Sequence, residues 1–74
     1  MNVRVKLFAV LRENRFRDRE MEFAPGSSLG DALDHIGIQP EEVSLPLING
    51  RYSSLADELQ EGDVLSIFPA VGGG

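Results

Sequence analysis

The chain has 74 residues, a formal net charge of −5 at pH 7 and no cysteine. A chain of this length forms one domain, near the lower limit at which a hydrophobic core alone supports folding. Lack of cysteine excludes a disulfide, a thiolate metal site and a cysteine nucleophile. No apolar run approaches the length of about 20 residues that spans a membrane, and the first residues do not resemble a signal peptide. We therefore expect a cytoplasmic protein with no membrane partner.

Charge is unevenly distributed along the chain. Residues 1–19 contain six basic residues and two acids, a net charge of +4, whereas residues 20–74 contain one arginine and ten acids, a net charge of −9. A mostly acidic surface repels phosphate, which argues against a nucleic acid partner and favours docking onto a basic protein surface. We interpret the arginine-rich stretch 12–19 as a solvated loop between strands.

Two alternating stretches begin the chain and predict an antiparallel hairpin. Residues 3–9 form the first strand and residues 19–23 the second, which has Met21 and Phe23 on its buried side. The polar stretch 11–19 is expected to be a loop. On the first strand, we expect one face to be buried and to carry Val3, Val5, Leu7 and Ala9, and the other face to carry Arg4, Lys6 and Phe8.

An amphipathic helix follows the hairpin. Ser28 is a candidate N-cap, and Asp31 three residues later completes a pattern close to a capping box. Gly37 is placed to end the helix in a left-handed conformation. Because so short a helix is not stable alone in water, its apolar stripe must pack on the sheet. The stripe consists of Leu29, Ala32, Leu33 and Ile36.

A second hairpin is predicted beyond the helix. Residues 45–48 form an apolar strand, and Pro46 places this strand at an edge of the sheet or at its own start. Asn49-Gly50 is typical of a type I′ turn, in which both central residues need positive φ. Residues 51–52 would then return as a short strand.

Short turns and one more strand complete the chain. Residues 40–43 and 55–59 each suggest a single helical turn, and in the second of these we expect Leu55 and Leu59 to point inward. A tight turn follows, and the last strand spans residues 64–68.

The predicted order is strand, strand, helix, strand, short strand, strand. The first and last strands are strongly apolar, as central neighbours in a sheet are. This order predicts an α+β protein of the β-grasp, ubiquitin-like class, with a mixed sheet of four to five strands and one main helix packed across it. We assign residues 1–68 to this domain and residues 69–74 to a flexible C-terminal tail.

Three stretches of the sequence carry a family resemblance. The ending EGDVLSIFPAVGGG (61–74), the opening VKLFAVLRE (5–13) and ING (48–50) resemble ubiquitin-like sulfur carriers, and most of all the small subunit of molybdopterin synthase. Two positions depart from that pattern. Ala70 stands where the family often has a second proline, and Gly72 adds a third glycine before the terminal pair.

The resemblance implies a reaction at the end of the tail. A separate activating enzyme would use ATP to adenylate the carboxylate of Gly74, and a sulfur donor protein would then convert it to a thiocarboxylate. Glycine at 73 and 74 leaves the acyl carbon unshielded and lets the backbone enter a narrow channel. Pro69 is expected to end the strand and aim the tail. Nothing in the sequence forms a nucleophile–base pair, so we expect no catalysis by this chain alone, no bound cofactor and no metal site.

A docking surface is expected beside the tail. Fixing six tail residues in a partner costs on the order of 6–12 kcal/mol of backbone entropy, so the folded domain must supply compensating contacts. Strand parity places Phe8 and Phe68 outward, and Tyr52 follows the Asn-Gly turn; alternatively, any of the three belongs to the core. The resemblance implies that these residues pack against the large subunit of molybdopterin synthase. We add Pro69, Val71 and Gly72 to the partner-binding set.

Other interpretations of the tail stay open at the level of sequence. The carrier could serve thiamine or another sulfur-containing metabolite, or it could be a ubiquitin-like modifier joined through Gly74 to lysines. An inert tail on an interaction module, or an expression remnant, would look the same. His35 is expected at the surface, and the acidic pairs Glu41-Glu42 and Asp57-Glu58 are expected in solvated turns.

Overall fold

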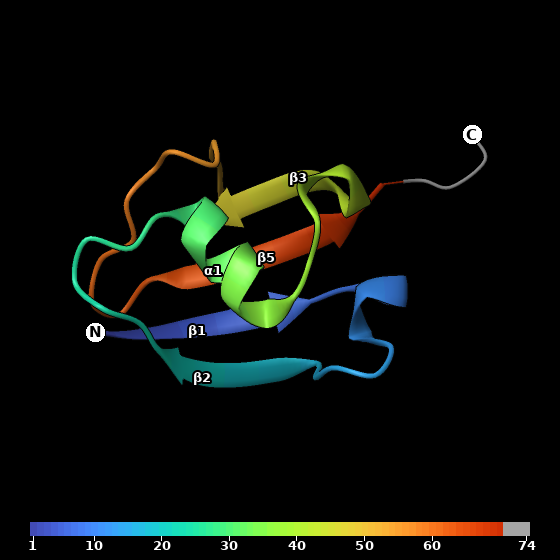
Figure 1. Cartoon of the computed structure of the whole chain (residues 1–74), viewed down its shortest axis with the longest axis horizontal. Helices are drawn as coiled ribbons and strands as arrows, with labels where there is room; N and C mark the ends of the chain where they lie inside the picture. Colours follow the sequence, from blue (N-terminus) through green and yellow to red (C-terminus); the bar gives the residue numbers. More distant parts are fainter. Residues whose placement is uncertain (71–74) are drawn as a thin grey trace.

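The computed structural model describes residues 1–70 and consists of one sheet and one α-helix (Figure 1). The strand order is β2-β1-β5-β3-β4; the central β1–β5 pair is parallel and the other pairs are antiparallel. This confirms the predicted β-grasp class. The elements are β1 (Asn2–Leu7), the 3₁₀ helix η1 (Ala9–Arg12), β2 (Asp18–Glu22), α1 (Leu29–Ile36), the 3₁₀ helix η2 (Pro40–Glu42), β3 (Val43–Ile48), β4 (Arg51–Tyr52) and β5 (Val64–Pro69).

Strand β1 follows the predicted alternation as far as Leu7. Val3, Val5 and Leu7 are fully buried, but Ala9 is exposed, and its expected place in the core is wrong. Ala9 has a φ of 51° and begins η1, which turns the chain out of the strand. The turn buries Leu11 instead, in a stretch that the sequence predicted to be a loop.

Helix α1 has the caps that the sequence predicts. The Ser28 hydroxyl accepts the Asp31 backbone N–H, and the Asp31 carboxylate accepts the Ser28 backbone N–H, a complete capping box. Gly37 follows the helix with a φ of 91°, and its N–H donates to the Leu33 carbonyl. These local interactions fix both ends of the helix at the predicted residues.

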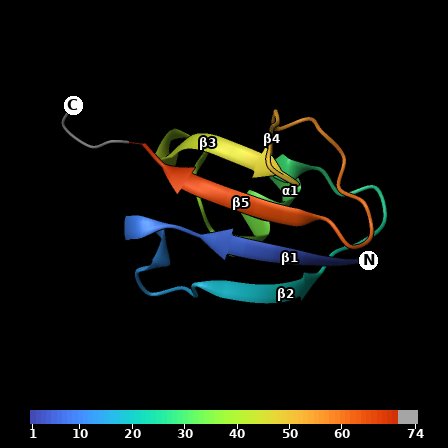
Figure 2. The same cartoon turned by 180° about the vertical axis from the view of Figure 1, so that it is seen from behind.

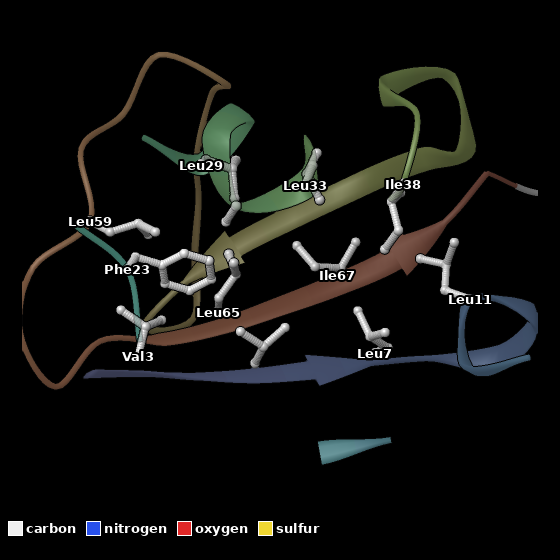
Figure 3. Packing of buried hydrophobic residues seen from close by; sticks show 12 residues of the cluster. Val3, Leu7, Leu11, Phe23, Leu29, Leu33, Ile38, Leu59, Leu65 and Ile67 are labelled. Carbon is white, nitrogen blue, oxygen red and sulfur yellow. The ribbon is translucent and has the colours of Figure 1, made fainter. Parts of the chain in front are cut away.

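The core lies between α1 and one face of the sheet (Figure 3). Figure 2 shows the opposite face of the sheet, which no helix covers within residues 1–70. We call it the free face. The fully or nearly fully buried side chains come from β1, η1, α1, β5 and the connecting segments: Val3, Val5, Leu7, Leu11, Phe23, Leu29, Ala32, Leu33, Ile38, Leu59, Leu65 and Ile67.

The loop before β5 differs from its prediction. No helical turn forms at 55–59, and Leu55 is 44% exposed, although Leu59 is buried as expected. The carbonyls of Leu55 and Asp57 instead accept the N–H groups of Gly30 and Leu29 at 2.9 and 2.8 Å. In this conformation the two carbonyls are available to the free donors at the start of α1, whereas a continuous helical turn would use its own carbonyls internally.

The Asn49-Gly50 turn is joined to β5 through Asp63. Both turn residues have positive φ, 53° and 79°, as a type I′ turn requires. The Asn49 amide donates to the Asp63 carboxylate at 2.9 Å and accepts the Val64 N–H at 2.9 Å. Asp63 is 8% exposed and also accepts the Gln60 N–H at 2.8 Å. One buried carboxylate therefore ties two turns to the start of the last strand.

Replacing Asp63 by alanine is expected to lower the free energy of unfolding by about 1–3 kcal/mol, because two part-buried hydrogen bonds lose their acceptor. Urea denaturation measures the change. Glu41→Ala is the matched control, since it removes the same charge from an exposed position and is expected to change stability by less than about 0.5 kcal/mol. Equal stability of both variants would show that the network contributes nothing.

None of the helices in the described range, residues 1–70, has the length and apolar character needed to cross a membrane.

Candidate functional site

The end of β5 is held against the start of β3. Strand β5 includes Pro69, one residue beyond its predicted end. The Ser44 hydroxyl donates to the Pro69 carbonyl at 2.9 Å, and the Ala70 N–H donates to the Glu42 carbonyl at 2.8 Å. These two bonds fix the position and direction from which the chain continues toward its C-terminus.

The remaining tail positions lie outside the described residues. The sequence predictions for Val71, Gly72, Gly73 and Gly74 therefore stay predictions.

Phe8 and Phe68 form an aromatic stack on the free face beside this exit. Their ring centroids are 4.1 Å apart and the ring planes differ by 11°. The parallel register pairs Leu7 with Ile67, so the next residue of each chain segment falls side by side. Both rings are half-buried and neither belongs to the core, which excludes the alternative that they are core residues.

Arg12 borders the stack on the η1 side. Its guanidinium carbon lies 5.4 Å from the centroid of the Phe8 ring, within cation–π range. Its Nε donates to the Leu7 carbonyl at 2.8 Å, which holds the side chain against the end of β1. Arg12 thus adds a positive charge at the edge of the aromatic stack.

The stack belongs to a wider apolar patch that crosses three strands of the free face. The β3–β5 register pairs Leu45 with Phe68 and Leu47 with Ser66, so both leucines face away from α1. Tyr52 lies on β4, pairs with Leu47 of β3 and is 69% exposed. Strand β3 lies between Tyr52 and the aromatic stack. We define the apolar patch as Phe8, Leu45, Leu47, Tyr52 and Phe68.

Charged side chains lie beside the patch on the β1 and β2 part of the free face. The β1–β2 register places Arg4 opposite Glu20 and Lys6 opposite Asp18. The Arg4 Nε donates to the Asp18 carboxylate at 2.8 Å. The apolar patch is therefore bordered by a row of side chains of both signs, the usual arrangement of an apolar centre with a polar rim.

Sequence reasoning identified the three aromatic residues and missed Leu45 and Leu47. The alternation of residues 45–48 carried a signal. If Pro46 and Ile48 face the core, Leu45 and Leu47 must face away from it. The face of this strand could be assigned only by its pairing with β5, which places Pro46 beside the buried Ile67.

The weaker candidates behave as turn and surface residues. His35 is exposed, as expected. The carboxylate of Asp57 accepts the Ser54 N–H at 2.8 Å, and that of Glu42 accepts the Gln39 N–H at 2.7 Å, so these acids close turns. Within residues 1–70, no three histidine or acidic side chains gather into a metal-binding group.

The β-grasp sheet and the strand that leads into a glycine-rich end define a ubiquitin-like carrier protein. The ThiS family model matches residues 5–74, so the chain belongs to the ThiS family, a family of ubiquitin-like sulfur carriers. Members of this family are small carrier subunits and not catalysts on their own.

Solved structures of similar chains agree with this assignment. SAMP1 from Haloferax volcanii is 30% identical, with a TM-score of 0.78 and full coverage of both chains. Putative molybdopterin converting factor subunit 1 from Pyrococcus furiosus is 29% identical, with a TM-score of 0.81, over 96% of this chain and 99% of that one. A complex of subunits 1 and 2 of molybdopterin-converting factor from Helicobacter pylori matches at 22% identity and a TM-score of 0.68 over the full length of both chains, which shows the fold alone.

Proposed function

We propose that this protein is the small, sulfur-donating subunit of molybdopterin synthase. The observation that carries the proposal is the Phe8–Phe68 stack, which lies on the free face directly before the Gly-ending tail. A docking surface next to a reactive terminus is what a carrier needs, because the partner must hold the body while the terminus enters an active site. The Pyrococcus furiosus relative, named a putative converting factor subunit, supports this choice of pathway.

The proposed chemistry takes place at the carboxylate of Gly74. A carboxylate oxygen attacks the α-phosphorus of ATP held by a partner activating enzyme, which releases pyrophosphate and leaves an acyl-adenylate. A hydrosulfide ion delivered by a donor protein then attacks the acyl carbon, and AMP leaves with the electron pair of the broken C–O bond. The product is a thiocarboxylate on Gly74. The protein itself binds no cofactor in this scheme.

The reach of the tail limits how the partner can bind. Pro69 and Ala70 are hydrogen-bonded to the body, so the four residues from 71 to 74 can span at most about 14 Å. The partner must therefore bring its catalytic groups within that distance of the end of β5. We propose that the apolar patch packs on the large subunit, which places Gly74 in the large subunit's active site. The Helicobacter pylori relative was solved as a complex of subunits 1 and 2.

The test is the conversion of the intact protein. Incubation with the activating enzyme, ATP and a sulfur donor is expected to raise the intact mass by the difference between one sulfur and one oxygen. The converted protein, mixed with the large subunit of molybdopterin synthase, is then expected to support molybdopterin formation. A mass change without molybdopterin formation, together with binding to a thiazole-forming enzyme, would instead assign the carrier to thiamine synthesis.

A second candidate function is protein modification. SAMP1 from Haloferax volcanii covers this chain fully, and a second structure of that kind, a small archaeal modifier protein 1, is 25% identical over 95% of the chain. Under this alternative the Gly74 adenylate is attacked by a lysine amine instead of sulfur. Gly-Gly remnants on lysines after proteolysis of cell extract would identify protein modification. Their absence would leave sulfur transfer as the remaining candidate function.

A further inference from the structure

A groove lies on the helix side of the sheet, between α1 and the edge strand β2. It holds a cavity of about 340 Å³. The floor of the groove is apolar, and its rim carries two arginines. Phe16, Met21 and Ile36 form the floor, and Arg15, Arg19 and His35 form the rim. A second cavity of about 570 Å³ shares Asn14, Arg15 and Ile36 and extends to the exposed Val10, so the groove is elongated. Glu13 and Glu42 also line this second cavity, so the positive charge of the groove lies in the 340 Å³ cavity.

The groove follows from the sheet register. Arg19 pairs with Val5 and Met21 with Val3, so both face the helix side of the sheet. The buried residues of α1 cover the centre of the sheet and leave the edge strand only partly covered. Phe16, Met21 and Ile36 pack against the core but stay half-exposed.

Acidic side chains are directed away from the 340 Å³ cavity. The three acids of β2 pair with Asn2, Arg4 and Lys6 and face the opposite side of the sheet. On α1, Asp31 is engaged in the capping box and Asp34 lines a different cavity. Among the described residues, the lining of the 340 Å³ cavity therefore contains two arginines and no acid, in a chain whose net charge is −5.

The two rim arginines are positioned by contacts with their own domain. Arg15 donates to the Leu11 and Gly37 carbonyls, and its Nη2 lies 3.8 Å from a Glu42 oxygen. The Arg19 guanidinium carbon lies 4.5 Å from the centroid of Phe16. Within residues 1–70 the ion pairs are Arg4–Asp18 and Arg15–Glu42, so Arg19 has no carboxylate partner there. Positioned cations lose less side-chain entropy when they bind an anion.

We propose that this groove binds an acidic peptide segment of a partner protein. One apolar side chain of the segment contacts Phe16, Met21 and Ile36, and flanking carboxylates contact Arg19, His35 and the outer edge of Arg15. The apolar floor distinguishes this ligand from a small anion, which would use the cations alone. Nucleic acid is disfavoured because the acidic body repels phosphate and Arg19 already covers the Phe16 ring.

The groove and the apolar patch lie on opposite faces of the sheet. A partner in the groove therefore leaves the patch and the tail accessible to a second protein. Such a site gives the carrier a way to contact one protein while its C-terminus reacts in another. The groove does not depend on the proposed sulfur chemistry, so the two proposals can fail separately.

The experiment is an NMR titration of the ¹⁵N-labelled full chain with the peptide acetyl-Asp-Glu-Leu-Glu-Asp-amide. Saturable shifts are expected at the amides of Phe16, Arg19 and Ile36 and not at Phe68. Arg19→Glu is expected to weaken binding about tenfold, and Arg51→Glu, which makes the same charge change at an exposed site outside the groove, less than about twofold. Arg19→Gln provides a milder variant if Arg19→Glu disturbs the spectrum. Replacing the peptide leucine by serine is expected to weaken binding about fivefold.

Each other outcome overturns the proposal. No saturable shift, or equal losses in Arg19→Glu and Arg51→Glu, would show only unspecific attraction between charges. Equal binding of the serine peptide would remove the role of the floor. Tighter binding of a short oligouridylate at the same amides would assign the groove to RNA. A chain that ends at Gly72 is expected to bind the peptide as the full chain does.

Discussion

A chain that ends at Gly72 is expected to form neither an adenylate nor a thiocarboxylate, while folding as the full chain does. The truncated chain still ends in a glycine carboxylate, so the chemistry of its terminus is unchanged. Its reach is shorter by two residues, about 7 Å. A displacement of about 1 Å can already cost on the order of 100-fold in rate, so this one should abolish the reaction. The core residues that the structure describes lie between Val3 and Ile67, so we expect stability to be unchanged.

Pyrophosphate release and the intact mass, measured with the activating enzyme, ATP and a sulfur donor, would test this expectation. Deletion of Gly72 alone is an instructive control, because it shortens the tail by one residue and keeps the terminal Gly73-Gly74 pair; an intermediate rate is expected. If the truncated chain supported its pathway as the full chain does, the tail would be inert and the protein would be an interaction module.

Local signals explain why much of the fold was predictable. The limits of α1 depend on Ser28, Asp31 and Gly37, which form their capping hydrogen bonds with residues three or four positions away. The Asn49-Gly50 turn depends on two residues that tolerate positive φ. Alternation in β1 predicted which side chains are buried because the strand has one covered face.

The errors fall where a distant segment decides the conformation. Alanine gives no signal for positive φ, so the turn at Ala9 could not be read from the sequence. The loop at Leu55 is not helical because the first N–H groups of α1 need acceptors, a requirement set about 25 residues earlier in the chain.

The candidate site was predictable in its parts and not in its assembly. Parity alone placed Phe8 and Phe68 outward, but their stacking requires the parallel β1–β5 register. The groove between α1 and β2 shows the same limit. Arg19 alternates with Met21 and so shares its face, but its place in an arginine-rich stretch favours a solvated loop at the level of sequence.

Single replacements of Phe8 or Phe68 by alanine are expected to weaken binding to the large subunit of molybdopterin synthase by about 2 kcal/mol each, roughly 30-fold. Each replacement removes the contact of one ring with the partner and also the support that this ring gives to the other. The domain itself should lose about 1 kcal/mol of stability, because both rings lie outside the core. Calorimetric titration measures the binding, and Leu55→Ala, an exposed apolar residue away from the patch, is expected to bind normally.

The double variant distinguishes a stacked unit from two separate contacts. Because the ring centroids are 4.1 Å apart, removing one ring already disrupts the surface offered by the other. The loss in the double variant should therefore be smaller than the sum of the single losses. The same variants should raise the KM of the synthase for the carrier and leave kcat largely unchanged, whereas tail truncation removes the reaction itself. Normal binding of both single variants would mean that the partner docks on a surface other than the apolar patch.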